Sequence, residues 1–176
     1  MDALECLQTR RSCRAFTAAV PPREVIEKVC LAGTYAPTGR GKQSPLIVAV
    51  TDRGVRDRLS RLNADIMHGS RGDWPDPFYG APVVLLVLAD STVPTHVYDG
   101  CSVIANLLAA AHACGLGSCW IHRAPEVTAS PEGRALLREL GIGDRYVGID
   151  HVVLGYAAGS AAQAAPRKAD YVRWVE

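Results

Sequence analysis

A cluster of basic residues lies near the start of the chain, in the segment TRRSCRAF at residues 9–16. It holds three arginines and a serine within five residues, namely Arg10, Arg11, Ser12 and Arg14. Guanidinium and hydroxyl groups that follow a helix end can converge on one phosphate through charge-assisted hydrogen bonds. A second basic pair, Arg167 and Lys168, follows the last predicted strand. We therefore predict that the two clusters form one phosphate pocket, with a phosphate monoester as ligand.

The formal net charge of the chain is only +1. A surface made for nucleic acid needs a broad excess of Lys and Arg, which this chain lacks. An arginine pair taken alone is most often a solvated surface feature, and here the density of the cluster argues against that reading. We expect a local anionic ligand and no nucleic-acid partner.

The sequence lacks two common nucleotide-binding motifs. The segment GRGK at residues 39–42 looks like the end of a P-loop, but Ala36 stands where that motif needs a glycine and Gln43 where it needs Ser or Thr. The dinucleotide fingerprint also fails, since no third glycine follows Gly39 and Gly41 in register. The sequence therefore predicts neither a nucleoside triphosphate nor a dinucleotide site of these types.

Two histidines and two cysteines that lie close together in the sequence are also candidate ligands of a zinc ion. The segment HACGLGSCWIH places His112, Cys114, Cys119 and His122 close together. The first two fall on different faces of a predicted helix, and the last two point to opposite sides of a predicted strand. We therefore expect no metal, and cysteines that pack as small apolar residues.

The size and composition of the chain favour one domain over residues 1–176, because 48% of its residues are hydrophobic. Acidic residues near the start replace the basic and apolar regions of a signal peptide, and the apolar runs are too short to span a bilayer. Six cysteines are scattered through predicted elements. We expect a soluble, cytoplasmic protein with reduced thiols and no membrane contact.

Hydrophobic periodicity, caps and turn residues predict a mixture of helices and strands. We expect helices at residues 2–10, 21–37, 53–67, 99–115 and 130–141. We expect strands at residues 46–52, 82–90, 117–122 and 151–157. The first two strands are predicted to form the centre of the sheet, and the turn-rich loop at 68–80 to cover a pocket. The tail at 165–176 alternates apolar and polar residues, which indicates an edge strand.

The helix predicted at 99–115 has almost no polar face. A helix that is apolar all round must be buried, and a second subunit is the simplest cover in so small a domain. We therefore predict a homodimer.

Five segments in order resemble the motifs of the FMN-dependent nitroreductase family. They are RRSCRAF, APTGRGKQSP, FYGAPVVLLVLAD, GLGSCWI, and VVLGY followed by PRK. The resemblance covers nearly the whole chain. It implies an α+β fold with a central mixed, mainly antiparallel sheet flanked by helices, paired as an intertwined homodimer with FMN at the interface.

The resemblance also implies which residues bind the cofactor. The phosphate would be held by Arg10, Arg11, Ser12, Arg14, Arg167 and Lys168. Pro37, Thr38 and Gly39 match a turn that the partner subunit lays against the flavin, and Gln43 matches the family's glutamine. The asparagine usual two residues before that glutamine is Gly41 here. Either water or a neighbour such as Asn63 replaces the polar contact of that asparagine, or the loop needs the positive φ that glycine allows.

Two further segments match family contacts with the flavin ring. Asn63 stands where the family often has an asparagine on the flavin, and an exposed helix position is its alternative reading. Ile121, His122 and Arg123 would offer backbone groups to the reactive edge of the ring. His122 is also a candidate general acid, although a backbone contact is the simpler interpretation.

The resemblance implies an FMN-dependent oxidoreductase with a ping-pong cycle and no side-chain nucleophile. Hydride would pass from NADH or NADPH to the flavin, and then to a nitroaromatic, a quinone or a similar small acceptor. Two alternatives remain: a flavin-binding carrier or sensor without nicotinamide turnover, and a relative that uses oxygen to modify a small molecule.

Overall fold

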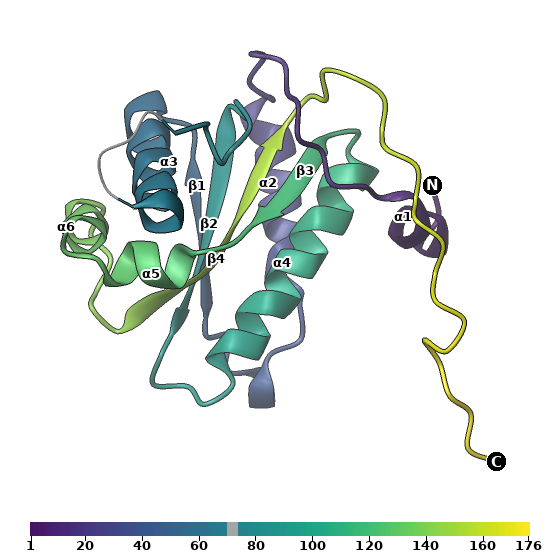
Figure 1. Ribbon diagram of the computed structural model, residues 1–176. Coiled ribbons are helices and arrows are strands. Elements are labelled where there is room, and N and C mark those ends of the chain that lie inside the picture. The colour runs from purple at the N-terminus through teal and green to yellow at the C-terminus, as the bar shows by residue number, and fades with distance from the viewer. Residues whose placement is uncertain (70–73) are drawn as a thin grey trace.

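The computed structural model describes residues 1–69 and 74–176. A twisted four-stranded sheet lies at the centre, with α2 and α4 on one face and α3, α5 and α6 on the other (Figure 1). The helices are α1 (Ala3–Thr9), α2 (Arg23–Thr34), α3 (Arg53–His68), α4 (His96–Ala113), α5 (Ala124–Ala129) and α6 (Pro131–Glu139). A short 3-10 turn, η1 (Gly39–Gly41), precedes the sheet.

The strands are β1 (Pro45–Val50), β2 (Val83–Asp90), β3 (Gly117–Ile121) and β4 (Tyr146–Gly155), in the spatial order β1-β2-β4-β3. All three ladders are antiparallel, and a single parallel bridge joins Ser12 to Ser118 at the outer edge of β3. The predicted α+β class with a mainly antiparallel sheet is confirmed.

Two hydrophobic clusters hold the layers together because side chains alternate across each strand. Val83, Leu85 and Val87 of β2 pack with α2 and α4. Leu86 and Leu88 of the same strand pack with α3, α5 and α6. The strand β2 is therefore buried on both faces, as its unbroken apolar sequence predicted.

Two expectations about the elements are wrong, and one helix was not predicted. The segment at 46–52 is not central, because β1 pairs only with β2 and lies at an edge of the sheet. In the part of the chain that the structure describes, the tail forms no edge strand: its pairing with the N-terminal segment ends where Ala158 N donates to Ala15 O, and residues 159–176 run exposed past α1 (Figure 1). The short helix α5 was missed. Of the predicted loop at 68–80, residues 70–73 lie outside the described residues.

The apolar helix α4 is only partly buried in one chain. Val103, Ile104 and Leu107 are buried against the sheet, whereas Ala105, Ala113 and Cys114 are exposed. The expectation of complete burial is therefore not met within a single chain. Among the helices of the described residues, none has the length and hydropathy to cross a membrane.

Candidate functional site

The arginine segment is held against the outer edge of β3. The helix α1 ends at Thr9, whose hydroxyl lies 2.9 Å from Nε2 of His112 on α4. The chain then extends, and Cys13 N donates a hydrogen bond of 2.9 Å to Ser118 O. An N-terminal segment without regular structure is thus fixed on the sheet by its backbone.

The two basic clusters meet at a cavity of about 580 Å³. Arg10, Arg11, Ser12 and Arg167 all line it. Arg11 Nη1 donates to Gln8 O and Arg10 O, both at 2.7 Å. The Nη1 atom of Arg10 is buried and has no hydrogen-bond partner among residues 1–69 and 74–176. A buried donor without a partner is costly, so this cavity suits an anion that accepts from it.

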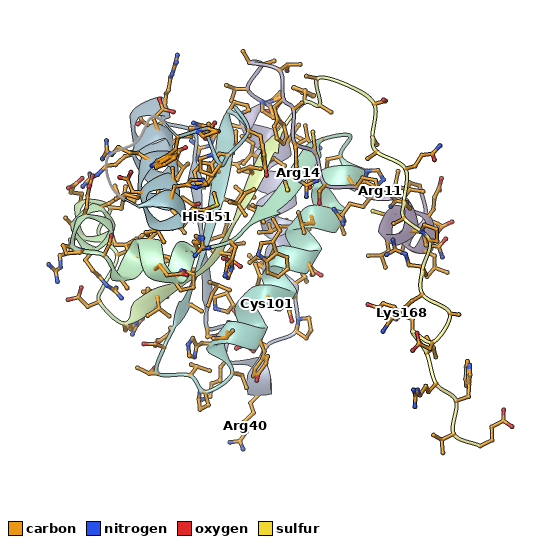
Figure 2. All side chains as sticks on the ribbon, viewed as in Figure 1. Arg11, Arg14, Arg40, Cys101, His151 and Lys168 are labelled. Atoms are coloured by element: carbon orange, nitrogen blue, oxygen red, sulfur yellow. The ribbon has the colours of Figure 1, made fainter. Side chains whose placement is uncertain are left out.

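Arg14 and Lys168 are placed differently from the other basic residues. Arg14 is exposed and lines a neighbouring cavity of about 590 Å³, together with Arg11 and Ser12. Lys168 lines neither cavity, and its Nζ lies 5.5 Å from the ring centre of Tyr171. Figure 2 shows Lys168 further along the tail than the end of α1, away from Arg14. The structure brings Arg167, but not Lys168, to the arginine segment.

The residues predicted to contact the flavin ring lie at the other end of β3. Ile121 is buried, whereas the side chain of His122 is 71% exposed. Arg123 has a left-handed φ of 84° and caps the start of α5. Asn63 on α3 is only 1% exposed, and its Nδ2 donates to His122 O at 2.8 Å. The reading of Asn63 as an exposed helix residue is therefore wrong, and its amide holds the turn after β3.

A buried carboxylate next to His122 was missed by the sequence analysis. Asp150 on β4 lies 3.0 Å from His122 Nδ1 through Oδ1, and Trp120 Nε1 donates to its Oδ2 at 2.6 Å. The Asp150 side chain is 8% exposed. An acidic residue inside the apolar run VGIDHVVLGY was the available signal, because a buried charge needs partners.

The loop at 37–43 is anchored by Asp99 at the start of α4. This buried carboxylate accepts from Gly39 N at 2.9 Å, Ser44 Oγ at 2.6 Å and Thr95 Oγ1 at 3.1 Å. Burial acts to raise the pKa of Asp99, but these hydrogen bonds outweigh it and keep the pKa below its ordinary value. Asp99 therefore acts as the fixed anion that shapes the loop.

The loop backbone turns through left-handed conformations. Gly41 has a φ of +66°, and Gln43 has a φ of 49° while its N–H donates to Thr38 Oγ1 at 3.1 Å. The expected positive φ at Gly41 is confirmed. Pro37 is exposed on the same loop.

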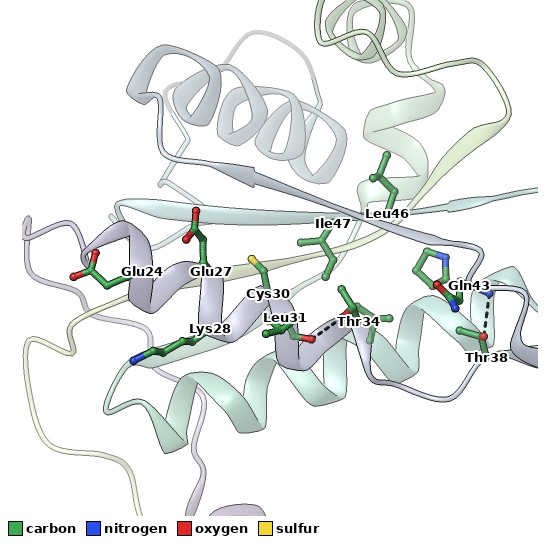
Figure 3. Close-up of a pocket in the computed structure, with 12 residues that line it drawn as sticks. Glu24, Glu27, Lys28, Cys30, Leu31, Thr34, Thr38, Gln43, Leu46 and Ile47 are labelled. Atoms are coloured by element: carbon green, nitrogen blue, oxygen red, sulfur yellow. Dashed lines mark hydrogen bonds between the residues drawn. The ribbon is translucent and has the colours of Figure 1, made fainter.

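A third cavity, of about 800 Å³, lies between α2, β1 and this loop (Figure 3). Thr38 and Gln43 line it, and so does Cys30. Burial, followed by the charge of Glu27, raises the pKa of Cys30 to about 11. The thiol therefore stays protonated at neutral pH and is a poor nucleophile.

The loop and the arginine segment are held at opposite ends of α4. Gly39 is bonded to Asp99 near the start of this helix, whereas Thr9 contacts His112 near its end. Thirteen residues of helix separate these two anchors, or about 20 Å. Figure 2 shows Arg40 on the loop and Arg11 beyond opposite ends of α4. Within one chain, the loop does not reach the arginine cavity.

Within the described part of the chain, no cluster of three or more His, Cys, Asp and Glu side chains could hold a metal ion. Cys119 is buried while Cys114 is exposed, so the candidate zinc ligands do not converge. All six cysteines are free thiols.

Known proteins resemble this chain over most of its length. The model of the family described as "Nitroreductase family" matches residues 7–156. A protein of Methanothermobacter thermautotrophicus, provisionally named NADH dehydrogenase/NAD(P)H nitroreductase, is 28% identical over 162 residues, which are 90% of this chain and 78% of that protein.

Two solved structures illustrate the range of the fold. A nitroreductase with bound FMN from Bacteroides fragilis superposes with a TM-score of 0.91 at 26% identity, over 100% of both chains. Iodotyrosine deiodinase bound to FMN and 3-iodo-L-tyrosine superposes with a TM-score of 0.76 at 21% identity, over 99% of this chain and 100% of that one.

Proposed function

The chain belongs to the nitroreductase family, and on that premise we propose that it is an FMN-dependent oxidoreductase. It takes hydride from NADH or NADPH and passes it to a nitroaromatic, a quinone or a similar small acceptor. The observation that carries the proposal is the arginine cavity beside β3, in a fold that binds FMN in the Bacteroides fragilis nitroreductase. The proposal takes residues 1–176 as one FMN-binding domain.

The residues of the arginine cavity fit the phosphate of FMN. The buried Nη1 of Arg10 has no acceptor in the part of the chain that the structure describes, and a phosphate monoester offers several. Arg11, Ser12 and Arg167 line the same cavity. These side chains, together with Arg14 at the neighbouring cavity, hold the phosphate in this proposal.

The rest of the proposed site follows β3 away from the phosphate. FMN supplies the hydride chemistry when it is bound, accepting hydride from NAD(P)H and releasing it to the acceptor in the second half of a ping-pong cycle. The protein orients the ring. Asn63 fixes the carbonyl of His122, so the backbone from Ile121 to Arg123 presents a rigid edge.

We propose a homodimer in which Pro37, Thr38, Gly39 and Gln43 of one subunit contact the cofactor bound by the other. The separation along α4 supports this arrangement, because the loop of one chain does not reach its own arginine cavity. The exposed Val97 and Tyr98 on α4 offer an apolar face to a second subunit. The proposal includes a cytoplasmic location, which the free thiols support.

The test is anaerobic reduction of the purified protein loaded with FMN. We expect NADH or NADPH to bleach the bound flavin, and a nitroaromatic or a quinone to restore its colour. Flavin that stays oxidised under excess NADH and NADPH would refute the oxidoreductase and leave a carrier or sensor. Consumption of oxygen with modification of a small molecule would instead identify the third class.

A matched pair of variants tests the phosphate assignment. Arg10→Ala removes the buried donor, and Arg138→Ala removes an exposed arginine on α6 that pairs with Asp144. Loss of a charge-assisted hydrogen bond costs about 1.5–3 kcal/mol, so Arg10→Ala weakens FMN binding by about 10- to 100-fold. The Arg138→Ala protein keeps its affinity. Equal affinities in the two variants would refute the assignment.

A further inference from the structure

An exposed imidazole is held by a buried carboxylate at the far end of β3. His122 Nδ1 lies 3.0 Å from Oδ1 and 3.1 Å from Oδ2 of Asp150. The two side chains differ sharply in exposure, at 71% for His122 and 8% for Asp150. The carboxylate therefore fixes the ring from behind, and the rest of the ring faces outward.

A third side chain fixes the carboxylate itself. The Trp120 indole can only donate, and its Nε1 donates to Asp150 Oδ2 at 2.6 Å. An ionised carboxylate can only accept, so its contact with His122 requires a proton on Nδ1. Nε2 is then the ring nitrogen that does not face the carboxylate. Nε2 makes no hydrogen bond to any residue that the structure describes.

The backbone of His122 is fixed independently of its ring. Asn63 Nδ2 donates to its carbonyl at 2.8 Å, from a buried position on α3. Ser12 is bridged to Ser118 near the start of β3, and His122 follows the end of the same strand. Four residues of strand separate Ser118 from His122, or about 13 Å. FMN is an elongated molecule with its phosphate at one end and its ring at the other, so the arginine cavity and His122 suit its two ends.

Three other titratable groups lie near His122 or Asp150: Cys101, Arg123 and His151. Burial, followed by the charge of Asp150, raises the pKa of Cys101 on α4, so this thiol is neutral. Arg123 Nη1 lies 3.4 Å from Glu126 Oε1, which offsets its charge. His151 is buried, and burial lowers its pKa to about 4, so this ring is also neutral near pH 7.

We propose, resting on the proposed function, that His122 is the proton donor of the acceptor half-reaction and that Asp150 is its positioning residue. A quinone that receives hydride on one oxygen becomes the hydroquinone monoanion, with one O–H bond formed and a negative charge on the other oxygen. The Nε2–H bond of protonated His122 breaks and an O–H bond forms on that oxygen, which gives the hydroquinone. The neutral ring then takes a proton from water. NAD(P)H supplies the hydride, so no other reductant is needed.

The kinetic test compares an acceptor that needs a proton with one that does not. Ferricyanide takes only electrons, whereas a quinone takes hydride and a proton. In His122→Gln we expect the rate of reoxidation by the quinone to fall about 100-fold, as for loss of a general acid, while the ferricyanide rate stays within twofold. His68→Gln, on the exposed end of α3, is the matched control and keeps both rates.

A spectroscopic test addresses Asp150 without relying on turnover. In the FMN-loaded protein with nitrogen-15 labelled histidine, the neutral His122 ring carries its proton on Nδ1. Asp150→Asn places an amide opposite Nδ1, which can donate to it and shift the proton to Nε2. We expect the nitrogen shifts of His122 to exchange in this variant, and the quinone rate to fall while the ferricyanide rate does not.

The outcomes separate this proposal from the proposed function. Failure of NADH and NADPH to reduce the bound flavin would overturn the proposed function and the proton donor with it. Normal reduction with an unchanged ratio of quinone to ferricyanide rates in His122→Gln would overturn the proton donor alone. An Nε2–H tautomer of His122 in the unaltered protein would overturn the role of Asp150.

Discussion

His151 makes the stability of the protein depend on pH between 6.5 and about 4. Its ring is fully buried beside Phe78, with ring centres 5.2 Å apart, and neither ring nitrogen has a partner among the described residues. Burial lowers its pKa from 6.5 to about 4; the charge of nearby His122 acts in the same direction, and the backbone of Ile121 opposes it. The folded protein therefore holds this ring neutral where the unfolded chain protonates it.

The sign and size of the effect follow from this difference. The unfolded chain binds more protons between pH 6.5 and about 4, so stability falls as pH falls through that window. A shift of one pKa unit corresponds to about 1.4 kcal/mol, which predicts a loss of about 2 kcal/mol between pH 7 and pH 5. Asp76 and Asp99 have lowered pKa values, so their contributions are lost only at more acid pH.

The assay is urea unfolding of the FMN-saturated protein at pH 7 and pH 5, at one protein concentration. His151→Leu removes the titrating ring and, with it, two buried ring nitrogens that have no partner among the described residues. We expect this variant to be as stable as the unaltered protein at pH 7 or more so, because unpaired polar groups are lost at similar volume. Its loss of stability between pH 7 and pH 5 is smaller by about 2 kcal/mol.

A second variant keeps the test decisive if His151→Leu folds poorly. His151→Met adapts to the same space and has no group that titrates. Equal losses between pH 7 and pH 5 in the unaltered protein and in a folded variant would refute the reasoning, since the four other histidines remain in both.

Three shorter predictions concern the proposed site. In Gly41→Ala the added Cβ meets no atom within 4 Å, but alanine is strained at a φ of +66°. We expect Tm to fall by about 2–4 °C for each 1 kcal/mol of folding stability that this strain removes. An unchanged Tm and flavin content would contradict the backbone role. Asp99→Asn leaves donors of the loop unpaired and costs about 1–3 kcal/mol, measured by urea unfolding. The dimer and bound FMN should be lost together on dilution, so a monomer that retains FMN in ultracentrifugation would refute the shared site.

Local signals in the sequence predicted most of the elements. The spacing of Val55, Leu59 and Leu62 predicted α3, and the unbroken apolar run predicted β2. The edge position of β1 was not predictable, because burial patterns report local environment whereas strand order depends on pairing between distant segments. The helix α5 was missed because it is six residues long and begins beside a proline.

The candidate site was predictable where residues cluster in sequence. Arg10, Arg11 and Ser12 are adjacent, and the structure places them at one cavity with Arg167. Asp150 and Trp120 come from neighbouring strands, and their meeting with His122 depends on the register of β3 and β4. Asp99 was predicted only as part of a helix. A carboxylate among apolar residues indicates a buried charge that needs hydrogen-bond donors, and Ser44 is one of them here.

The order of the strands also bears on how the chain folds. Each of the three ladders joins strands that are separated along the chain by at least one helix, so none is closed by a tight hairpin turn. Every pairing must therefore close a long loop before its hydrogen bonds form, and such high contact order slows folding. Helices such as α3 and α4 can form locally before the sheet does. Before the sheet forms, the apolar β2 is an exposed strand with two unpaired edges. The chain is therefore most prone to aggregate before β4 pairs with β2.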